Sequence, residues 1–335
     1  MADTATVGVL TAGAWGTALA QTMARAGNKV LVWDRDVQVV DDINQRHENR
    51  KRYPGIKLDD KVMATDDVAA VTKHCDVIVV AAPSDVNPYL AAQLAARVEA
   101  RHVLVLASKG FRESDGALLS TIWQEACPQA GGLCVLTGPS FARELMHKQV
   151  TAFTVAGSDS ATVGRVADLF DVPFVRAYEH DDVLGAQVGG ALKNVLAIAS
   201  GILDGLEMGY NARAAMLSRG LVEMGRYAKL MGGRAETVMG LTGMGDLLLT
   251  ATSELSRNYR FGQLIGKGVP LHEAKLKIGT VEGILAARIV TVQAQAHGVD
   301  LAVMSAIDGV LHGDVTPLKV VDYLMRRPRK REFDA

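Results

Sequence analysis

Hydrophobic positions in the first 180 residues form short runs that alternate with longer stretches of mixed polarity. Short apolar runs predict buried strands, and the stretches between them have the spacing of amphipathic helices. Alternating strands and helices predict a parallel, doubly wound sheet. The runs that predict strands are Thr6 to Leu10, Lys29 to Trp33, Val77 to Ala82, His102 to Leu106, Leu133 to Thr137, Val150 to Ala156 and Pro173 to Ala177.

The pattern changes near Tyr178 to Asp182, because no convincing strand follows and the rest of the chain has helical periodicity. A length of 335 residues also exceeds what one hydrophobic core usually serves. The sequence therefore predicts the α/β class, with a Rossmann-like doubly wound sheet in an N-terminal domain (1–180) and an all-α C-terminal domain (181–335).

The run from Leu184 to Leu203 is apolar on nearly every face of the predicted helix, and its single charge is Lys193, followed by Asn194. An unpaired ammonium is costly to bury, so Lys193 is the first catalytic candidate. A lysine that reaches the surface is one alternative. A membrane span is another, but a central lysine costs roughly 2.5–3.5 kcal/mol there. Gly189 and Gly190 weaken a helix, so something must approach this backbone closely.

The turn after the first predicted strand has glycine at two of the three positions of the dinucleotide-binding fingerprint, namely Thr11, Gly13 and Gly16. Asp34 follows at about the ~20 residues expected of an acid that binds the ribose of NAD. Arg35, beside it, can accept the additional phosphate of NADP. The alternative for this pair is an exposed charged turn.

Thr11 occupies the first glycine position of this fingerprint. A β-branched residue is poorly suited to positive φ, so we expect a negative φ at Thr11. The turn can then still present the amides of Ala14 and Trp15 to a pyrophosphate, because Gly13 and Gly16 are present.

Small residues also follow three further predicted strands, at Pro83 to Ser84, Ser108 to Gly110 and Gly138 to Ala142. Ligands of doubly wound sheets bind beyond these carboxyl ends. Lys109 is therefore expected to face a substrate phosphate or carbonyl, unless it is simply solvated.

Two segments of the helical half carry further candidates. Glycines interrupt the helices immediately before Asp246. Arg257 stands between Ser256 and Asn258, and a guanidinium suits a phosphate better than an ammonium does because it forms bidentate bonds. The alternative for Arg257 is an ordinary helix-surface charge.

Charge and cysteine content narrow the function classes. The 36 basic and 37 acidic residues leave no electrostatic footprint for nucleic acid. The histidines and the three cysteines show no metal-site spacing, and we expect no metal, no integral membrane span and a cytoplasmic location. Basic clusters are interpreted as a solvated loop and a solvated tail: Arg46, Arg50, Lys51 and Arg52, and the closing run Arg326 to Arg331.

Taken together, these segments resemble the bacterial type of NAD(P)-dependent glycerol-3-phosphate dehydrogenase over nearly the whole chain. The segments that carry the resemblance are AGAWGTALA (12–20), SKG (108–110), GPSFARE (138–144), GGALKNVLAIASGILDGL (189–206), GDLLLT (245–250), SRNYRFG (256–262) and VEG (281–283). Thr11 departs from the family's glycine, and the loop from Arg50 to Asp60 is only loosely similar.

The resemblance implies reduction of dihydroxyacetone phosphate to sn-glycerol 3-phosphate with NADH or NADPH, which supplies glycerophospholipid synthesis, and we expect a homodimer. Lys193 would be the acid/base, assisted by Lys109 and Asp246. The cofactor would contact Gly13, Ala14, Trp15, Gly16, Asp34, Arg35, Lys109, Ala142, Arg257, Thr280 and Glu282. The phosphorylated substrate would contact Lys109, Gly138, Ser140, Lys193, Asn194, Asp246, Ser256, Arg257 and Asn258.

Two other readings remain at this point. One is a two-domain dehydrogenase of the 3-hydroxyacid or 6-phosphogluconate type, whose helix-borne lysine is followed four residues later by asparagine, in a K-x-x-x-N pattern. Here Asn194 directly follows Lys193, and the residue four positions after the lysine is Ala197, which argues against those families. A catalytically silent nucleotide sensor is the alternative of a different class, and Thr11 is the residue that raises it. Such a sensor would not need Lys109, Lys193 and Asp246 together.

Overall fold

The computed structural model describes residues 6–329 and 331–332. Its sheet has eight strands in the order β3-β2-β1-β4-β5-β6-β7-β8. All neighbouring strands are parallel except β6 and β7, which are antiparallel. The strands are β1 (Thr6–Leu10), β2 (Lys29–Trp33), β3 (Val62–Thr65), β4 (Val77–Val80), β5 (Val103–Leu106), β6 (Gly132–Thr137), β7 (Thr151–Gly157) and β8 (Val175–His180).

The doubly wound sheet is confirmed, with two differences from the sequence prediction. The short edge strand β3 was not predicted. The reversal at β7 follows from α6 (Ala142–Met146), whose five residues rise only about 7.5 Å, whereas the six residues of β6 extend about 20 Å. The connection therefore does not return along the sheet, and β7 runs back beside β6.

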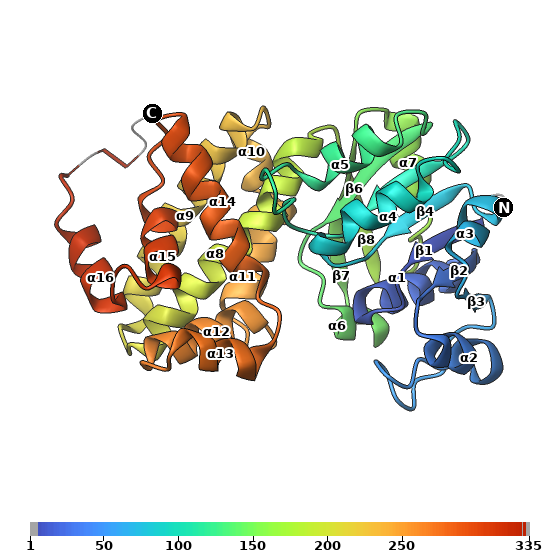
Figure 1. Ribbon diagram of the computed structural model, residues 1–335, viewed down its shortest axis with the longest axis horizontal. Helices are drawn as coiled ribbons and strands as arrows, with labels where there is room; N and C mark the ends of the chain where they lie inside the picture. Colours follow the sequence, from blue (N-terminus) through green and yellow to red (C-terminus); the bar gives the residue numbers. More distant parts are fainter. Residues whose placement is uncertain (1–5, 330, 333–335) are drawn as a thin grey trace.

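Helices cover both faces of the sheet (Figure 1). Along β4, Val77 and Val79 belong to one apolar core, and Ile78 and Val80 belong to the core on the opposite face. This alternation is what a strand buried on both faces requires. The sheet region's helices are α1 (Ala14–Arg25), α2 (Val37–Arg46), α3 (Val68–His74), α4 (Asn87–Leu94), α5 (Leu119–Ala126), α6 and α7 (Ser160–Asp168).

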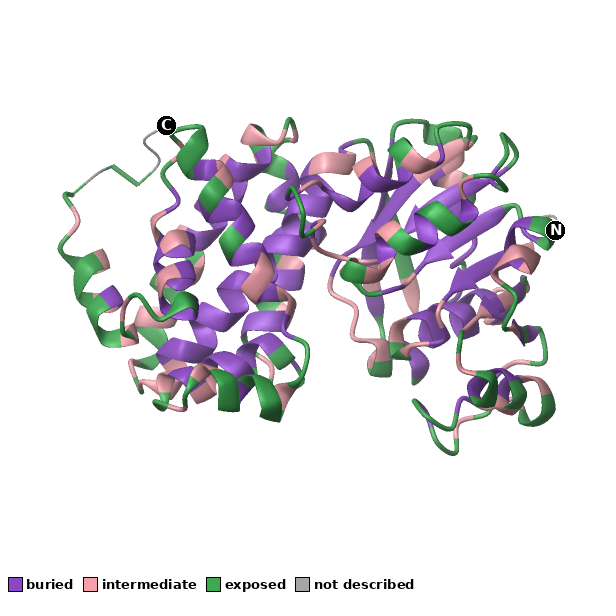
Figure 2. Ribbon diagram, viewed as in Figure 1, coloured by how far each residue is buried: buried purple, intermediate pink, exposed green. Residues whose placement is uncertain are grey.

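After β8 the chain is helical and is organised around α8 (Val183–Gly205). This helix is long and apolar enough to span a membrane, but 94% of its most apolar window is buried inside the fold (Figure 2). It is the core helix that its all-round apolar pattern predicted. The others are α9 (Gly209–Leu230), α10 (Ala235–Val238), a π-helical turn (Leu241–Gly245), α11 (Asp246–Ala251), α12 (Arg257–Gly266), α13 (Leu271–Ile278), α14 (Glu282–Ala296), α15 (Ala302–His312) and α16 (Pro317–Met325).

Candidate active site

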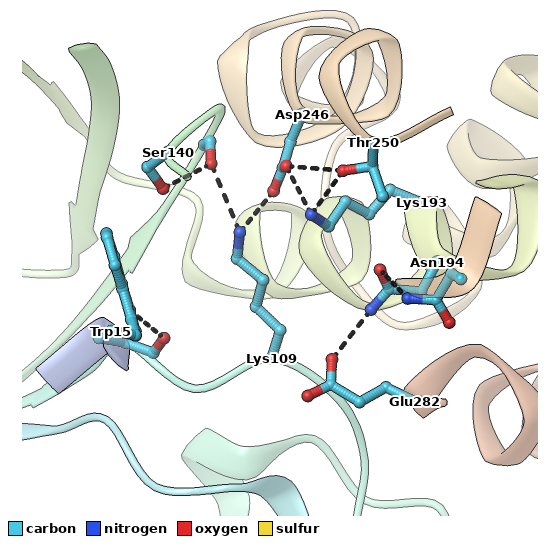
Figure 3. A network of polar contacts seen from close by, with 11 residues as sticks. Trp15, Lys109, Ser140, Lys193, Asn194, Asp246, Thr250 and Glu282 are labelled. Atoms are coloured by element: carbon cyan, nitrogen blue, oxygen red, sulfur yellow. Dashed lines mark hydrogen bonds and ion pairs between the residues drawn. The ribbon is translucent and has the colours of Figure 1, made fainter. Parts of the chain in front are cut away.

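Asp246 lies where the sheet meets the helical half and binds two lysines (Figure 3). Its Oδ1 is 2.5 Å from Nζ of Lys193 on α8, and its Oδ2 is 2.5 Å from Nζ of Lys109, which follows β5. The Asp246 side chain is 1% exposed, against 10% for Lys193 and 19% for Lys109. One buried carboxylate thus holds two ammonium groups that come from different halves of the chain.

Close packing around α8 makes this arrangement possible. A Cβ at Gly189 would lie 2.6 Å from the carbonyl oxygen of Thr242, in the turn that leads to Asp246. A Cβ at Gly190 would lie 2.8 Å from Oγ1 of Thr137 and 3.4 Å from Cγ of Lys109. The close approach that the glycine pair predicted is confirmed, and it brings both partners of the cluster to the helix.

The local chain also explains the position of Asp246. The π-helical turn Leu241–Gly245 comes directly before it, and a Cβ at Gly243 would lie 2.0 Å from the Val238 carbonyl oxygen. Such turns are rare and are frequently found at functional sites. Asp246 then begins α11, so Thr250, one helical turn on, faces the same side.

Thr250 is a member of the cluster that sequence reasoning missed. Its hydroxyl accepts a hydrogen bond from Nζ of Lys193 at 2.8 Å and donates one to Oδ1 of Asp246 at 3.2 Å. The i, i+4 spacing from Asp246 was the signal that could have revealed it. It fixes the direction of the Lys193 ammonium.

Burial and charge set the protonation states of this cluster. Burial lowers the pKa of Lys193 to about 8, although the carboxylate of Asp246 opposes the shift, and the charge of Lys109 lowers the pKa further. Burial also opposes ionisation of Asp246, but the two ammonium groups outweigh it and keep the pKa of Asp246 below its ordinary value. Lys193 is thereby suited to proton transfer near neutral pH.

A second polar chain joins three helices beside the lysines. The side-chain amide of Asn194 donates to Glu282 at 3.1 Å, and that of Asn258 donates to Oδ1 of Asn194 at 3.0 Å. Oδ1 of Asn258 accepts from the Gly283 amide at 3.1 Å. Asn258, predicted as a substrate contact, therefore also holds α8, α12 and α14 together.

The remaining predicted substrate residues come from two segments, the chain after β6 and the start of α12. Nζ of Lys109 and Oγ of Ser140 both donate to the carbonyl oxygen of Gly138, at 3.4 and 3.0 Å. Ser256 caps α12 by accepting from the Tyr259 amide, and Arg257, the first residue of α12, is exposed. Their contacts with substrate stay predictions.

The glycine-rich turn has the geometry of a pyrophosphate cradle. Gly13 precedes the first residue of α1, Ala14, without a side-chain cap. A Cβ at Gly16 would lie 2.1 Å from the carbonyl oxygen of Thr11, so only glycine fits there. Trp15 donates from Nε1 to the carbonyl oxygen of Ala107, beside Lys109. An uncapped helix N-terminus on a glycine turn fits a dinucleotide.

The expected negative φ at Thr11 was wrong, because the structure has φ +81°. Two contacts hold this strained conformation. The Thr11 amide donates to the carbonyl oxygen of Trp33 at 2.8 Å, and its hydroxyl donates to the carbonyl oxygen of Ala81 at 3.2 Å. The tight turn requires the left-handed region whatever residue stands there, and the neighbouring strand ends impose it.

The other predicted cofactor residues come from separate segments of the chain. Asp34 accepts hydrogen bonds from the amides of Ala12 (2.7 Å) and Asp36 (3.0 Å), so its carboxylate also shapes the turn. Arg35 and Thr280 are exposed, and Ala142 begins α6.

Family models match both halves of this chain. The N-terminal model of NAD-dependent glycerol-3-phosphate dehydrogenase covers residues 6–163, and the C-terminal model covers residues 182–322. The chain belongs to this family. The NAD-dependent glycerol-3-phosphate dehydrogenase family is thus favoured over the 3-hydroxyacid and 6-phosphogluconate types.

Relatives and solved structures agree along the full length. The chain is 43% identical over 328 residues to "Glycerol-3-phosphate dehydrogenase [NAD(P)+]" of Xanthomonas euvesicatoria, covering 98% of this chain and 96% of the relative. The glycerol-3-phosphate dehydrogenase structure from Coxiella burnetii has a TM-score of 0.90 and 34% identity, covering 97% of this chain and 99% of that one. The enzyme structure from Saccharomyces cerevisiae has a TM-score of 0.85 and 26% identity, covering 96% and 99%.

Proposed function

We propose that this chain is an oxidoreductase that reduces dihydroxyacetone phosphate to sn-glycerol 3-phosphate, reversibly, with NADH or NADPH. The observation that carries the proposal is the buried Asp246 with the ammonium groups of Lys193 and Lys109 on its two oxygens. Family membership supports the same reaction.

The chemistry divides between the cofactor and the chain. The nicotinamide ring, when bound, supplies the hydride that the ketone carbon accepts. Negative charge grows on the ketone oxygen, and Nζ of Lys193 donates the proton that neutralises it. Lys193 is left as an amine and regains its proton from solvent, and in the oxidation direction that amine takes the hydroxyl proton.

Asp246 and Lys109 have supporting roles in this proposal. The carboxylate of Asp246 aims the Lys193 ammonium and partly compensates the energetic cost of burying it. Lys109 adds positive potential next to the developing oxyanion. Thr250 helps to orient the Lys193 ammonium, because its hydroxyl accepts a second hydrogen bond from Nζ.

The substrate phosphate is proposed to bind at the start of α12. Ser256 and Asn258 are buried there, and Arg257 is exposed, so its guanidinium is free to bind the phosphate through two hydrogen bonds. Gly138, Ser140 and Asn194 complete the proposed substrate contacts. The cofactor contacts are proposed as predicted above, from the glycine-rich turn and the end of β2 to Ala142, Thr280 and Glu282.

We also propose a cytoplasmic protein that supplies glycerophospholipid synthesis and assembles as a homodimer, with a division into domains at residues 180 and 181. Cys75, Cys127 and Cys134 are free thiols buried in the fold, which suits a reducing compartment. The homodimer rests on the family resemblance, and sedimentation velocity tests it.

The decisive experiment follows the absorbance of NADH and of NADPH with dihydroxyacetone phosphate as substrate, and with dihydroxyacetone as the matched compound that lacks the phosphate. We expect turnover of the phosphorylated ketone with both cofactors and little turnover of the other. Absence of turnover with both cofactors, in protein that is folded by circular dichroism, would contradict the proposal.

A further inference from the structure

The loop after α2 is anchored at two points to the glycine-rich turn and the start of α1. Asn49 is fully buried, and its amide nitrogen donates to the carbonyl oxygen of Ala12 and to Oγ1 of Thr17, both at 2.8 Å. The hydroxyl of Tyr53 donates to the carbonyl oxygen of Ala14 at 2.9 Å. The three basic residues between these anchors, Arg50 to Arg52, are therefore held beside the glycine-rich turn.

This loop also has a defined internal shape. Oδ1 of Asn49 accepts from the amide of Arg52 at 3.2 Å, and the Tyr53 amide donates to the carbonyl oxygen of Asn49 at 2.7 Å. An isolated antiparallel bridge between Glu48 and Lys57 closes the loop at its base. The sequence predicted a solvated loop, but a buried asparagine that bonds to the glycine-rich turn gives this loop a fixed position.

Of these three basic residues, Lys51 reaches the segment that follows β2. Nζ of Lys51 lies 2.6 Å from Oδ2 of Asp36, the residue that follows Arg35. The side chains of Arg35 and Arg52 are exposed and, within residues 6–329 and 331–332, form no hydrogen bond or ion pair. Arg50 instead faces α2, where it lies 3.8 Å from Asp42.

The charges gathered here suit a phosphate dianion. Asp34 gives both of its oxygens to backbone amides, and Lys51 neutralises Asp36. Arg35, which follows Asp34 at the end of β2, and the exposed Arg52 of the anchored loop then add positive charge on the side of the sheet where a doubly wound fold places the ribose of a dinucleotide. Guanidinium groups bind phosphate through paired hydrogen bonds, which a ribose hydroxyl does not require.

We propose that Lys51 and Arg52, carried by the anchored loop, complete with Arg35 a subsite for the 2′-phosphate of NADP(H). The inference rests on the proposed function because it places the cofactor's ribose beyond β2. It assigns a specificity role to a loop that the sequence pattern alone left as solvated.

Calorimetric titration with 2′,5′-ADP and with 5′-AMP tests the subsite without any turnover. We expect wild-type protein to bind 2′,5′-ADP more tightly than 5′-AMP. Lys51→Ala or Arg52→Ala should weaken 2′,5′-ADP by about 5- to 10-fold, as expected for one charge-assisted contact, and should change 5′-AMP by less than about 2-fold. Lys57→Ala, an exposed lysine of the same loop, is the matched control and should change neither.

A further variant separates direct contact from simple neutralisation of Asp36. In Lys51→Ala with Asp36→Asn, the freed carboxylate is removed, and asparagine still caps α2. Weak binding of 2′,5′-ADP should persist in this double variant. Full recovery would contradict a phosphate contact by Lys51, as would equal losses with both nucleotides or an effect of similar size in Lys57→Ala.

The kinetic experiment distinguishes this inference from the proposed function. The ratio of kcat/KM with NADPH to that with NADH should fall by the factor seen in the titrations. If the titrations give the expected result but the protein does not reduce dihydroxyacetone phosphate, the subsite is supported and the proposed reaction is contradicted. Turnover with NADH and no selective loss in the variants would reject the subsite alone.

Discussion

The proposed active site has two ends, the Asp246 cluster and the loop that carries Lys51, and they place charge in different surroundings. At the Asp246 cluster the carboxylate is 1% exposed, and the side chains of Lys193 and Lys109 are 10% and 19% exposed. At the loop that carries Lys51 the lysine side chain is 58% exposed, and that of its partner Asp36 is 30% exposed. Charge interactions are strong in a buried, low-dielectric site and are screened at a surface. Substitutions at the first end should therefore change the rate of the reaction, whereas substitutions at the second should change which cofactor is preferred.

Lys193→Met tests the buried end and should have the largest effect. Methionine fills a similar volume without a proton to donate, so we expect kcat to fall by about 10²–10⁴-fold while the protein stays folded. Lys229→Met, at an exposed lysine of α9, is the control and should keep normal turnover. Steady-state kinetics with dihydroxyacetone phosphate provide the measurement. Near-normal kcat in Lys193→Met would remove the lysine from the chemistry.

Arg257→Lys tests the proposed phosphate site at the start of α12. A single ammonium replaces the bidentate guanidinium at the start of α12, so the KM for dihydroxyacetone phosphate should rise by about 10-fold with a smaller change in kcat. The effect on the KM for NADH should be smaller than that for the substrate. An unchanged substrate KM would show that the phosphate binds elsewhere.

Arg35→Ala tests the exposed end. Loss of the guanidinium should reduce kcat/KM with NADPH by about 5-fold and leave the value with NADH within about 2-fold. Arg46→Ala, which removes an exposed arginine of α2 that pairs with Asp42, is the matched control. Equal losses with the two cofactors in Arg35→Ala would exclude a contact with the 2′-phosphate.

Substitutions of Thr11, in the glycine-rich turn, should have the smallest effect, and this effect is on the free energy of unfolding. Both Thr11→Ala and Thr11→Gly lose the hydroxyl bond to Ala81, but only glycine relieves the φ of +81°. The glycine variant should therefore be more stable than the alanine variant by about 1 kcal/mol, measured by urea unfolding. At an ordinary φ the order is reversed, because glycine enlarges the unfolded ensemble. An alanine variant more stable than the glycine variant would contradict the strained turn.

The sequence was informative where a residue conflicted with its surroundings. Lys193 in an apolar helix and the glycine pair before it predicted both a core helix and a close approach, and both are confirmed. The carboxyl ends of the strands likewise placed Lys109 at the correct edge of the sheet.

What the sequence could not predict depends on contacts between distant segments. The family resemblance grouped Lys109, Lys193 and Asp246, but no local pattern indicated that the two lysines bond to separate oxygens of this one carboxylate. No local pattern indicated either that Asn49 bonds to Ala12 and fastens its loop. The prediction of a negative φ at Thr11 was wrong for a similar reason. Local preference favours negative φ for threonine, but the strand ends that bond to its amide and hydroxyl fix the turn.

The pH dependence of a single turnover tests the buried end most directly. Enzyme loaded with NADPH is mixed with dihydroxyacetone phosphate between about pH 6 and pH 10, and NADPH oxidation is followed. Reduction requires the protonated lysine, and burial lowers the pKa of Lys193 to about 8. We therefore expect a constant rate below about pH 8 and a fall of about tenfold per pH unit above it, with the opposite trend for glycerol 3-phosphate oxidation. A rate that does not change across this range, or an identical inflection in Lys193→Met, would contradict the account.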